Sequence, residues 1–224
     1  TGHAYTLDTV APTAVATVTA LSSDTGSSTS DFTTSVASQT VTGTFTGTLG
    51  SGETIQVSAD GGTTWVTATT SGTNWTASGV TLSSGAGTLS VRTLDTAGNS
   101  TSGTGHAYTL DTVAPTAVAT VKALSSDTGS STSDFTTSVA SQTVTGTFTG
   151  TLGSGETIQV SADGGTTWVT ATTSGTNWTA SGVTLSSGAG TLSVRTLDTA
   201  GNSTSGTGHA YTLDTVAPTA VATV

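Results

Sequence analysis

Acidic side chains are the residues of this chain that most clearly suggest binding chemistry. The sequence holds 13 Asp and Glu against three Lys and Arg, and every carboxylate falls in or beside an expected loop or linker. Clustered carboxylates are unfavourable unless a cation joins them, and calcium binds about six to eight oxygens from carboxylates, amides, carbonyls and water. Asp and Asn are also ordinary turn residues, so the alternative is that these loops bind nothing. The candidate ligands in the first half of the chain are Asp8, Asp24, Asp31, Glu53, Asp95 and Asn99.

These loops belong to a repeated unit. The run TGHAYTLDTVAPTAVATV begins at Thr1, Thr104 and Thr207, and residues 1–121 differ from 104–224 only in Thr19, which becomes Lys122. A spacing of this length is too long for a solenoid and suits one small sandwich domain per repeat. We predict the tail of a preceding repeat at 1–8, immunoglobulin-like repeats at 9–111 and 112–214, and the head of a following repeat at 215–224. The only proline of each period stiffens the linker.

Short β-strands are the elements that must position the acidic loops. Alternating apolar and polar residues between Gly- and Asp-rich turns predict about seven strands per repeat and no helix. In the first repeat the expected strands are 14–21, 40–46, 53–59, 63–69, 75–82, 88–94 and 105–110. About seven short strands in roughly 100 residues are typical of an immunoglobulin-like β-sandwich. The predicted fold class is therefore all-β, with tandem sandwiches joined end to end by short Pro-containing linkers.

The strand order sorts the loops between two ends of each module. An odd number of strands in an up-and-down path brings the chain in at one end, the upstream pole, and out at the other, the downstream pole. Glu53, Asp95 and Asn99 are then expected at the upstream pole beside Asp8, while Asp24, Asp31 and Asp60 are expected at the downstream pole. The same reasoning gathers a second group at the joint between the repeats, across from Asp24 and Asp31: Asp111, Glu156, Asp198 and Asn202.

Composition excludes several classes of function. The net charge of −10 argues against nucleic acids and anionic membrane surfaces, whose partners carry clustered cations. The absence of Cys excludes thiolate zinc sites, iron–sulfur clusters and cysteine nucleophiles. His106 and His209 lack partners at ligand spacing, and no G-x-S-x-G turn supports a serine nucleophile. We therefore expect neither an enzyme nor a small-molecule substrate.

Aromatic and threonine side chains leave two further alternatives. Trp65 and Trp75 could form a platform for carbohydrate, but we predict that both belong to the core. The row of Thr42, Thr44 and Thr46 could suggest ice binding, but a solvent-facing side of an antiparallel strand explains it. The exchange of Thr19 for Lys122 predicts that this position also faces solvent.

Three motifs carry a family resemblance. VSADGGTTW at 57–65, LDTAGN at 94–99 and LDTVAPTA at 110–117 resemble the bacterial Ig-like extender repeats of giant RTX surface adhesins, particularly those of ice-binding adhesins. The resemblance implies a secreted, cell-surface rod with calcium at or near the linkers. This chain departs from the family at 33–39, where family members commonly carry further acidic residues or Asn. The resemblance therefore does not extend to a calcium ligand in that segment. The ligands that the resemblance implies are Asp8, Asp111 and Asp214 in the linkers, Asp95 and Asp198, and Asp24, Asp31, Asp127 and Asp134.

The function that these features favour is mechanical. We expect a calcium-rigidified extender that projects a distal ligand-binding domain from the cell, with neighbouring identical repeats as its partners and no direct membrane contact. One alternative is an adhesin module that itself binds a glycan or ice. Another is a homotypic contact between cells, as in a biofilm.

Overall fold

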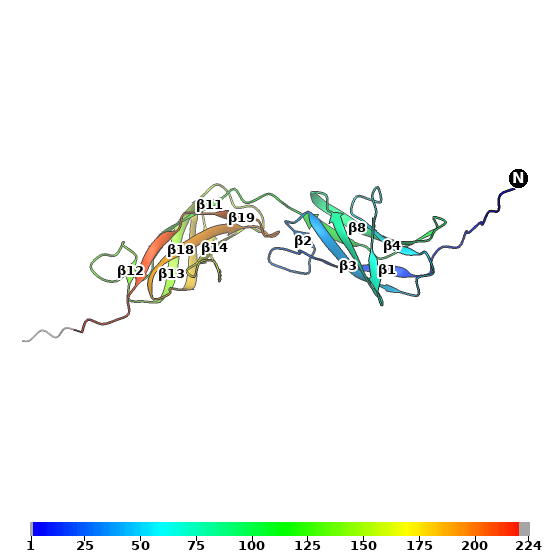
Figure 1. Ribbon diagram of the computed structural model, residues 1–224. Helices are drawn as coiled ribbons and strands as arrows, with labels where there is room; N and C mark the ends of the chain where they lie inside the picture. Colours follow the sequence, from blue (N-terminus) through cyan, green and yellow to red (C-terminus); the bar gives the residue numbers. More distant parts are fainter. Residues whose placement is uncertain (1, 220–224) are drawn as a thin grey trace, which may run out of the picture. The chain divides into compact units, whose positions relative to one another are not determined.

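The computed structural model describes residues 2–219 and consists of β-strands joined by turns and loops. Residue 1 and residues 220–224, the latter from the expected head of a following repeat, lie outside this part. The chain divides after Val113 into two compact units. Each unit has two sheets, as Figure 1 shows. The predicted all-β sandwich fold is confirmed. The described part of the chain has no helix long and apolar enough to cross a membrane.

The two sheets of the first unit have four and six strands. In the smaller sheet the order is β1-β3-β7-β6, and in the larger one it is β2-β10-β8-β4-β5, with β9 also paired to β8. The strands are β1 (Val15–Leu21), β2 (Thr33–Thr34), β3 (Ser38–Thr46), β4 (Thr54–Ser58), β5 (Val66–Thr67), β6 (Thr69–Ser71), β7 (Asn74–Thr81), β8 (Gly85–Leu94), β9 (Ser100–Ser102) and β10 (His106–Leu110).

The second unit repeats this arrangement strand for strand. Its sheets have the orders β11-β13-β17-β16 and β12-β20-β18-β14-β15, with β19 also paired to β18. The strands are β11 (Val118–Leu124), β12 (Thr136–Thr137), β13 (Ser141–Thr149), β14 (Thr157–Ser161), β15 (Val169–Thr170), β16 (Thr172–Ser174), β17 (Asn177–Thr184), β18 (Gly188–Leu197), β19 (Ser203–Ser205) and β20 (His209–Leu213).

Trp75 is the largest fully buried side chain of the first core. Its indole nitrogen donates to the carbonyl of Thr44, 3.0 Å away, so the ring's one polar atom is satisfied inside the sandwich. The ring lies over Gly43, where an added Cβ would be 2.3 Å from the indole and 2.0 Å from the carbonyl oxygen of Thr17. Only glycine therefore lets the indole and β1 approach β3 this closely. The prediction that Trp75 belongs to the core is confirmed.

The expected outward-facing positions of the smaller sheet face solvent. Thr44 and Thr46 are exposed and Thr42 is half-buried, as their alternation with buried neighbours predicts. Thr19 lies at an irregularity in the pairing of β1 with β3, between Val18 and Ala20, and it is exposed. Lys122 occupies the same exposed position in the second unit, which explains why a long cation replaces a threonine there without disturbing the core.

The structure corrects the strand count from about seven to ten per unit. The expected strand at 63–69 does not exist as one element, because the carboxylate of Asp60 accepts hydrogen bonds from Thr64 and extends the turn to that residue. The chain then pairs with β4 through β5 and crosses to the other sheet as β6.

The expected strand at 105–110 is preceded by a further short strand, β9, and a break at 103–105 separates β9 from β10. Thr104 lies in this break and bonds to β1, accepting from Val18 and donating to Ala16. The two-residue strand β2, which runs parallel to β10, was not predicted, because a pair of threonines in a Ser/Thr-rich loop carries no alternation.

Candidate functional site

The loop at 95–99 and Asp8 meet at the upstream pole of the first unit, as predicted. The Asp95 carboxylate accepts hydrogen bonds from the side-chain amide of Asn99 and the backbone N–H groups of Ala97 and Asn99, all at 2.8–2.9 Å. These bonds, first that of the Asn99 side chain, hold the pKa of Asp95 below its usual value. The Asn99 amide also donates to the carbonyl of Asp8, 3.1 Å away. Asp95 and Asn99 thus fix their own loop and tie the incoming segment to it.

Glu53 lies in the neighbouring loop at this pole. Its carboxylate accepts from the backbone N–H of Gly50 at 2.8 Å. An added Cβ on Gly52 would be 2.7 Å from the methyl group of Thr96, so this loop touches the 95–99 loop. In the second unit, Glu156 and Asp198 make the equivalent bonds to Gly153 and Asn202. The carboxylates of the upstream loops are therefore engaged with their own backbone.

Asp24 differs from the other carboxylates of the first unit. One of its oxygens accepts from the backbone N–H of Phe32 at 2.9 Å, while the other is buried without a hydrogen-bond partner. Asp127 repeats this arrangement with Phe135 in the second unit. Leaving a buried acceptor unsatisfied costs about 1–3 kcal/mol, and more when it is charged. A cation beside this oxygen would remove that cost.

The loop that carries Asp24 is held firmly from several sides. Phe32 has a positive φ of 60°, which is unusual for an aromatic residue, and its ring stacks on His106 with centroids 3.7 Å apart. Gln39 is buried under the loop and donates to the carbonyls of Ser23 and Val36. The unpaired oxygen of Asp24 is therefore not a consequence of a loose loop.

The remaining predicted ligands cap turns. Asp31 and Asp134 are exposed and accept from the backbone N–H two residues ahead, as do the linker residues Asp8, Asp111 and Asp214. Within residues 2–219 no three carboxylate or imidazole groups lie close enough to hold a metal ion. The group predicted at the joint would draw on both units and stays a prediction. Asp24 and Asp127 fit a cation best, provided that carbonyl, amide, hydroxyl or water oxygens complete the shell.

Asp60 has a structural role at the downstream pole. Hydrogen bonds from Thr64, first from its hydroxyl and then from its backbone N–H, hold the pKa of this carboxyl at about 2, below the ordinary 3.8. The neighbouring carbonyl of Ala59 accepts from the hydroxyl of Tyr108 on β10, 3.0 Å away. The turn is thereby tied to the strand that leads out of the unit.

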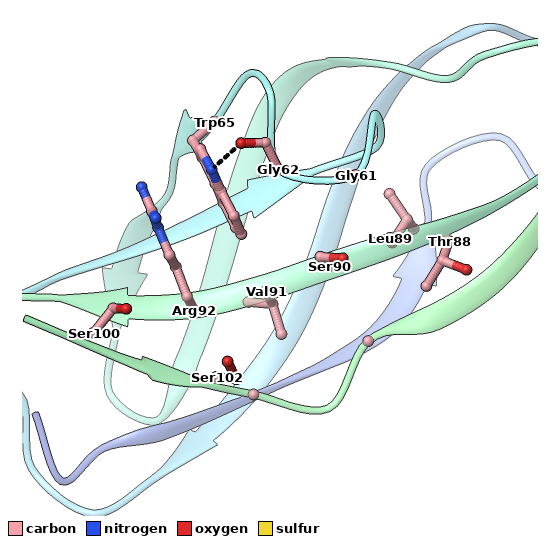
Figure 2. Close-up of a pocket in the computed structure, with 12 residues that line it drawn as sticks. Gly61, Gly62, Trp65, Thr88, Leu89, Ser90, Val91, Arg92, Ser100 and Ser102 are labelled. Atoms are coloured by element: carbon pink, nitrogen blue, oxygen red, sulfur yellow. Dashed lines mark hydrogen bonds between the residues drawn. The ribbon is translucent and has the colours of Figure 1, made fainter.

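Trp65 is the residue that the sequence interpretation placed wrongly. It is half-buried on the outer face of the larger sheet and not in the core, and the guanidinium of Arg92 lies 4.0 Å from the centre of its ring. Figure 2 shows the two side chains lying side by side next to the Gly61–Gly62 turn. Arg92 is the only Arg of its repeat, and it faces outward because its neighbours Val91 and Thr93 are buried. A tryptophan just after a Gly-Gly turn, together with a lone outward-facing arginine on a later strand, is the sequence signal that could have located this site.

Comparisons with known proteins identify one family. The model of the bacterial Ig-like domain matches residues 9–112 and 114–215, which is most of the chain. No curated protein matches in sequence.

Several solved structures are similar to the chain. A structure from a 1.5-MDa bacterial ice-binding adhesin is 23% identical over 89% of this chain, with a TM-score of 0.40. The chain spans 63% of the length of that structure. Fibronectin(III)-like modules of Clostridium thermocellum CbhA are 14% identical over 80% of this chain and 88% of their own, with a TM-score of 0.42. The BSP domain of a biofilm associated protein is 17% identical over 82% of this chain and 29% of its own, with a TM-score of 0.29.

Proposed function

The chain belongs to the bacterial Ig-like domain family, and from this premise we propose that it is a non-catalytic extender segment of a secreted, cell-surface adhesin. Its repeats would act as a spacer that holds a distal ligand-binding domain away from the cell. The single observation that carries the proposal is that two nearly identical sandwiches, each with its own buried core, follow one another in one chain.

The path of the chain through each unit supports this function. On the upstream side, the hydroxyl of Thr101 donates to the carbonyl of Pro12 at 2.5 Å, just before β1 begins. On the downstream side, the N–H of Asp111 donates to the carbonyl of Thr34, just after β10 ends. The chain is therefore braced where it arrives and where it leaves. Tension applied along such a chain passes through hydrogen-bonded strands at both ends of each unit.

Calcium is the second part of the proposal. Asp24 and Asp127 would hold the ion in their loops, where each has a buried oxygen without a partner. When bound, calcium would supply positive charge to a chain that carries a net charge of −10. Extracellular modules bind calcium with dissociation constants of about 0.1–1 mM, so millimolar calcium outside the cell would fill such sites. Asp111, Glu156 and Asp198 remain candidates for a second ion at the joint between the repeats.

Small-angle X-ray scattering of the two-repeat chain tests the extender directly. We expect a long particle with a well-defined maximum dimension in a few millimolar calcium, and a broader distribution of dimensions after chelation. A compact particle in calcium would contradict the extender. A long particle that is unchanged by chelator would leave the extender standing and would contradict the proposed stiffening by calcium, leaving the proline linker to supply the rigidity.

A further inference from the structure

A groove of about 380 Å³ lies on the outer face of the larger sheet in each unit. In the first unit its walls include Trp65 and the Gly61–Gly62 turn on one side and Ser102 with Gly103 on the other, with Ser90 of β8 between them. Figure 2 shows these residues around β8. The second unit has the equivalent lining, including Trp168, Arg195 and Ser193. A volume of this size falls within the range of about 300–1,000 Å³ that small-ligand sites occupy.

The groove exists because the strand beside β8 is interrupted between β9 and β10. Gly103 leaves the sheet after β9, and an added Cβ there would be 2.1 Å from the carbonyl oxygen of Ala16. Gly105 passes equally close to the carbonyl of Leu89 before β10 begins. Between these two points the chain pairs with β1 instead of lying flat beside β8. The sheet surface at Ser90 is therefore not covered by side chains from a continuous neighbouring strand.

The indole of Trp65 is fixed before any ligand arrives. Its ring nitrogen donates to the carbonyl of Gly62 at 2.9 Å, and Arg92 stacks on the ring. Arg92 is itself held by Gln56, whose side-chain oxygen accepts from both the Nε and an Nη atom at 3.0 and 2.8 Å. A rigid aromatic wall binds with little loss of conformational entropy. The ring therefore meets the requirement for a stacking platform, and the same contacts recur around Trp168.

The chemistry of the lining favours one class of ligand. Arg92 is the only charged residue among the described residues that line the first groove, and two of its nitrogen atoms are engaged with Gln56. Ser90, Ser100 and Ser102 add hydroxyl groups to the floor and the opposite wall of the groove. The chain's net charge of −10 repels polyanions, while Arg92 disfavours a cation in the groove itself. A neutral sugar offers apolar ring faces to an aromatic wall and hydroxyl groups to polar neighbours.

We propose that each unit binds a neutral oligosaccharide in the groove between its half-buried tryptophan and the interrupted strand beside β8 or β18. The sugar stacks on Trp65 or Trp168 and exchanges hydrogen bonds with the serines of the groove. Because the grooves recur in the repeats of one chain, a polysaccharide that reaches several of them binds more tightly than a short oligosaccharide. This activity is separate from the extender function and does not depend on calcium.

Calorimetric titration of the two-repeat chain with neutral hexasaccharides tests the proposal. The probes are cellohexaose, laminarihexaose, maltohexaose and mannohexaose, with heparin as an anionic comparison. We expect binding of at least one neutral probe at millimolar or lower concentration. The double variant Trp65→Ala/Trp168→Ala should weaken it about tenfold or more, as loss of an aromatic stacking partner predicts. The matched control Thr70→Ala/Thr173→Ala, on the exposed strands β6 and β16, should bind normally.

A second variant guards against a folding defect. Ser102→Tyr/Ser205→Tyr adds bulk at exposed rim positions and keeps both tryptophans, so it should abolish binding without changing the melting temperature. The proposal is overturned if none of the four neutral probes binds. It is also overturned if both groove variants bind the probe as tightly as the parent chain does. Binding of heparin alone that is lost in the tryptophan variant would overturn the assignment to neutral sugars.

Discussion

The unpaired carboxylate oxygens of Asp24 and Asp127 make the effect of a single-atom change predictable. In Asp24→Asn/Asp127→Asn, the amide keeps an oxygen that accepts from the N–H of Phe32 or Phe135 and replaces the buried, unpaired charged oxygen by an NH₂ group. Without calcium, we expect stability within about 1 kcal/mol of the parent, because one unsatisfied polar group replaces another. With calcium, the parent should gain stability and the variant should not.

The size of the gain follows from mass action. For a dissociation constant of about 0.1–1 mM and about 5 mM calcium, binding adds about 1–2.3 kcal/mol per site. For a domain of about 100 residues this corresponds to a rise of about 5–11 °C in melting temperature. Differential scanning calorimetry with calcium and with chelator measures it.

The control is Asp31→Asn/Asp134→Asn, which removes the same charge from exposed positions of the same loops. We expect the control to keep the calcium-induced rise. An equal rise in the parent and in the Asp24→Asn/Asp127→Asn chain would refute the assignment of the ion to these oxygens. An equal loss in the variant and the control would show that net loop charge, and not the buried oxygen, is responsible.

Three further predictions concern the framework, each to be made at the equivalent position of both units. Gly43→Ala should lower the free energy of unfolding by about 3 kcal/mol, at the upper end for overpacking, because the new methyl group meets both the Trp75 ring and a backbone oxygen. The control is Gly79→Ala, where the space is open and only the positive φ opposes a side chain; it should cost about 1 kcal/mol. Urea unfolding measures both. Trp75→Ala should cost about 3–5 kcal/mol, whereas Trp65→Ala should cost much less because that ring lies half-buried on the outer face of the sheet, and chemical denaturation compares the two. Asp60, whose folded pKa of about 2 lies below its ordinary 3.8, should add stability above pH 3.8 that is lost as the pH falls from 3.8 to 2. Carbon-detected NMR titration would show a pKa near 3.8 if the Thr64 bonds do not form.

The repeat, the all-β class and the sorting of loops between the poles can be inferred from the amino-acid sequence without a structure. The 103-residue repeat can be read directly from the sequence. Threonines that alternate with the apolar residues Val41 and Phe45 locate β3 without knowledge of the strands that pair with it. The meeting of Asp8 with the 95–99 loop was expected from strand parity, and it holds with the corrected strand count because added short strands need not reverse the chain: β9 and β10 both run antiparallel to β8. These features depend on local patterns, so a single sequence is enough to find them.

Three-dimensional packing was needed to see which side of the sandwich each aromatic residue faces and which carboxylate oxygen lacks a partner. Trp65 and Trp75 have similar local sequences, but Trp65 ends a turn that Thr64 prolongs, while Trp75 lies on a strand over Gly43. The unpaired oxygen of Asp24 arises from the packing of its loop against Phe32 and Gln39, which depends on contacts with β10 and β3. Alternation cannot reveal such features, because they depend on hydrogen bonds within turns, such as that from Thr64 to Asp60, and on contacts between distant segments, such as that between Thr109 and Phe32.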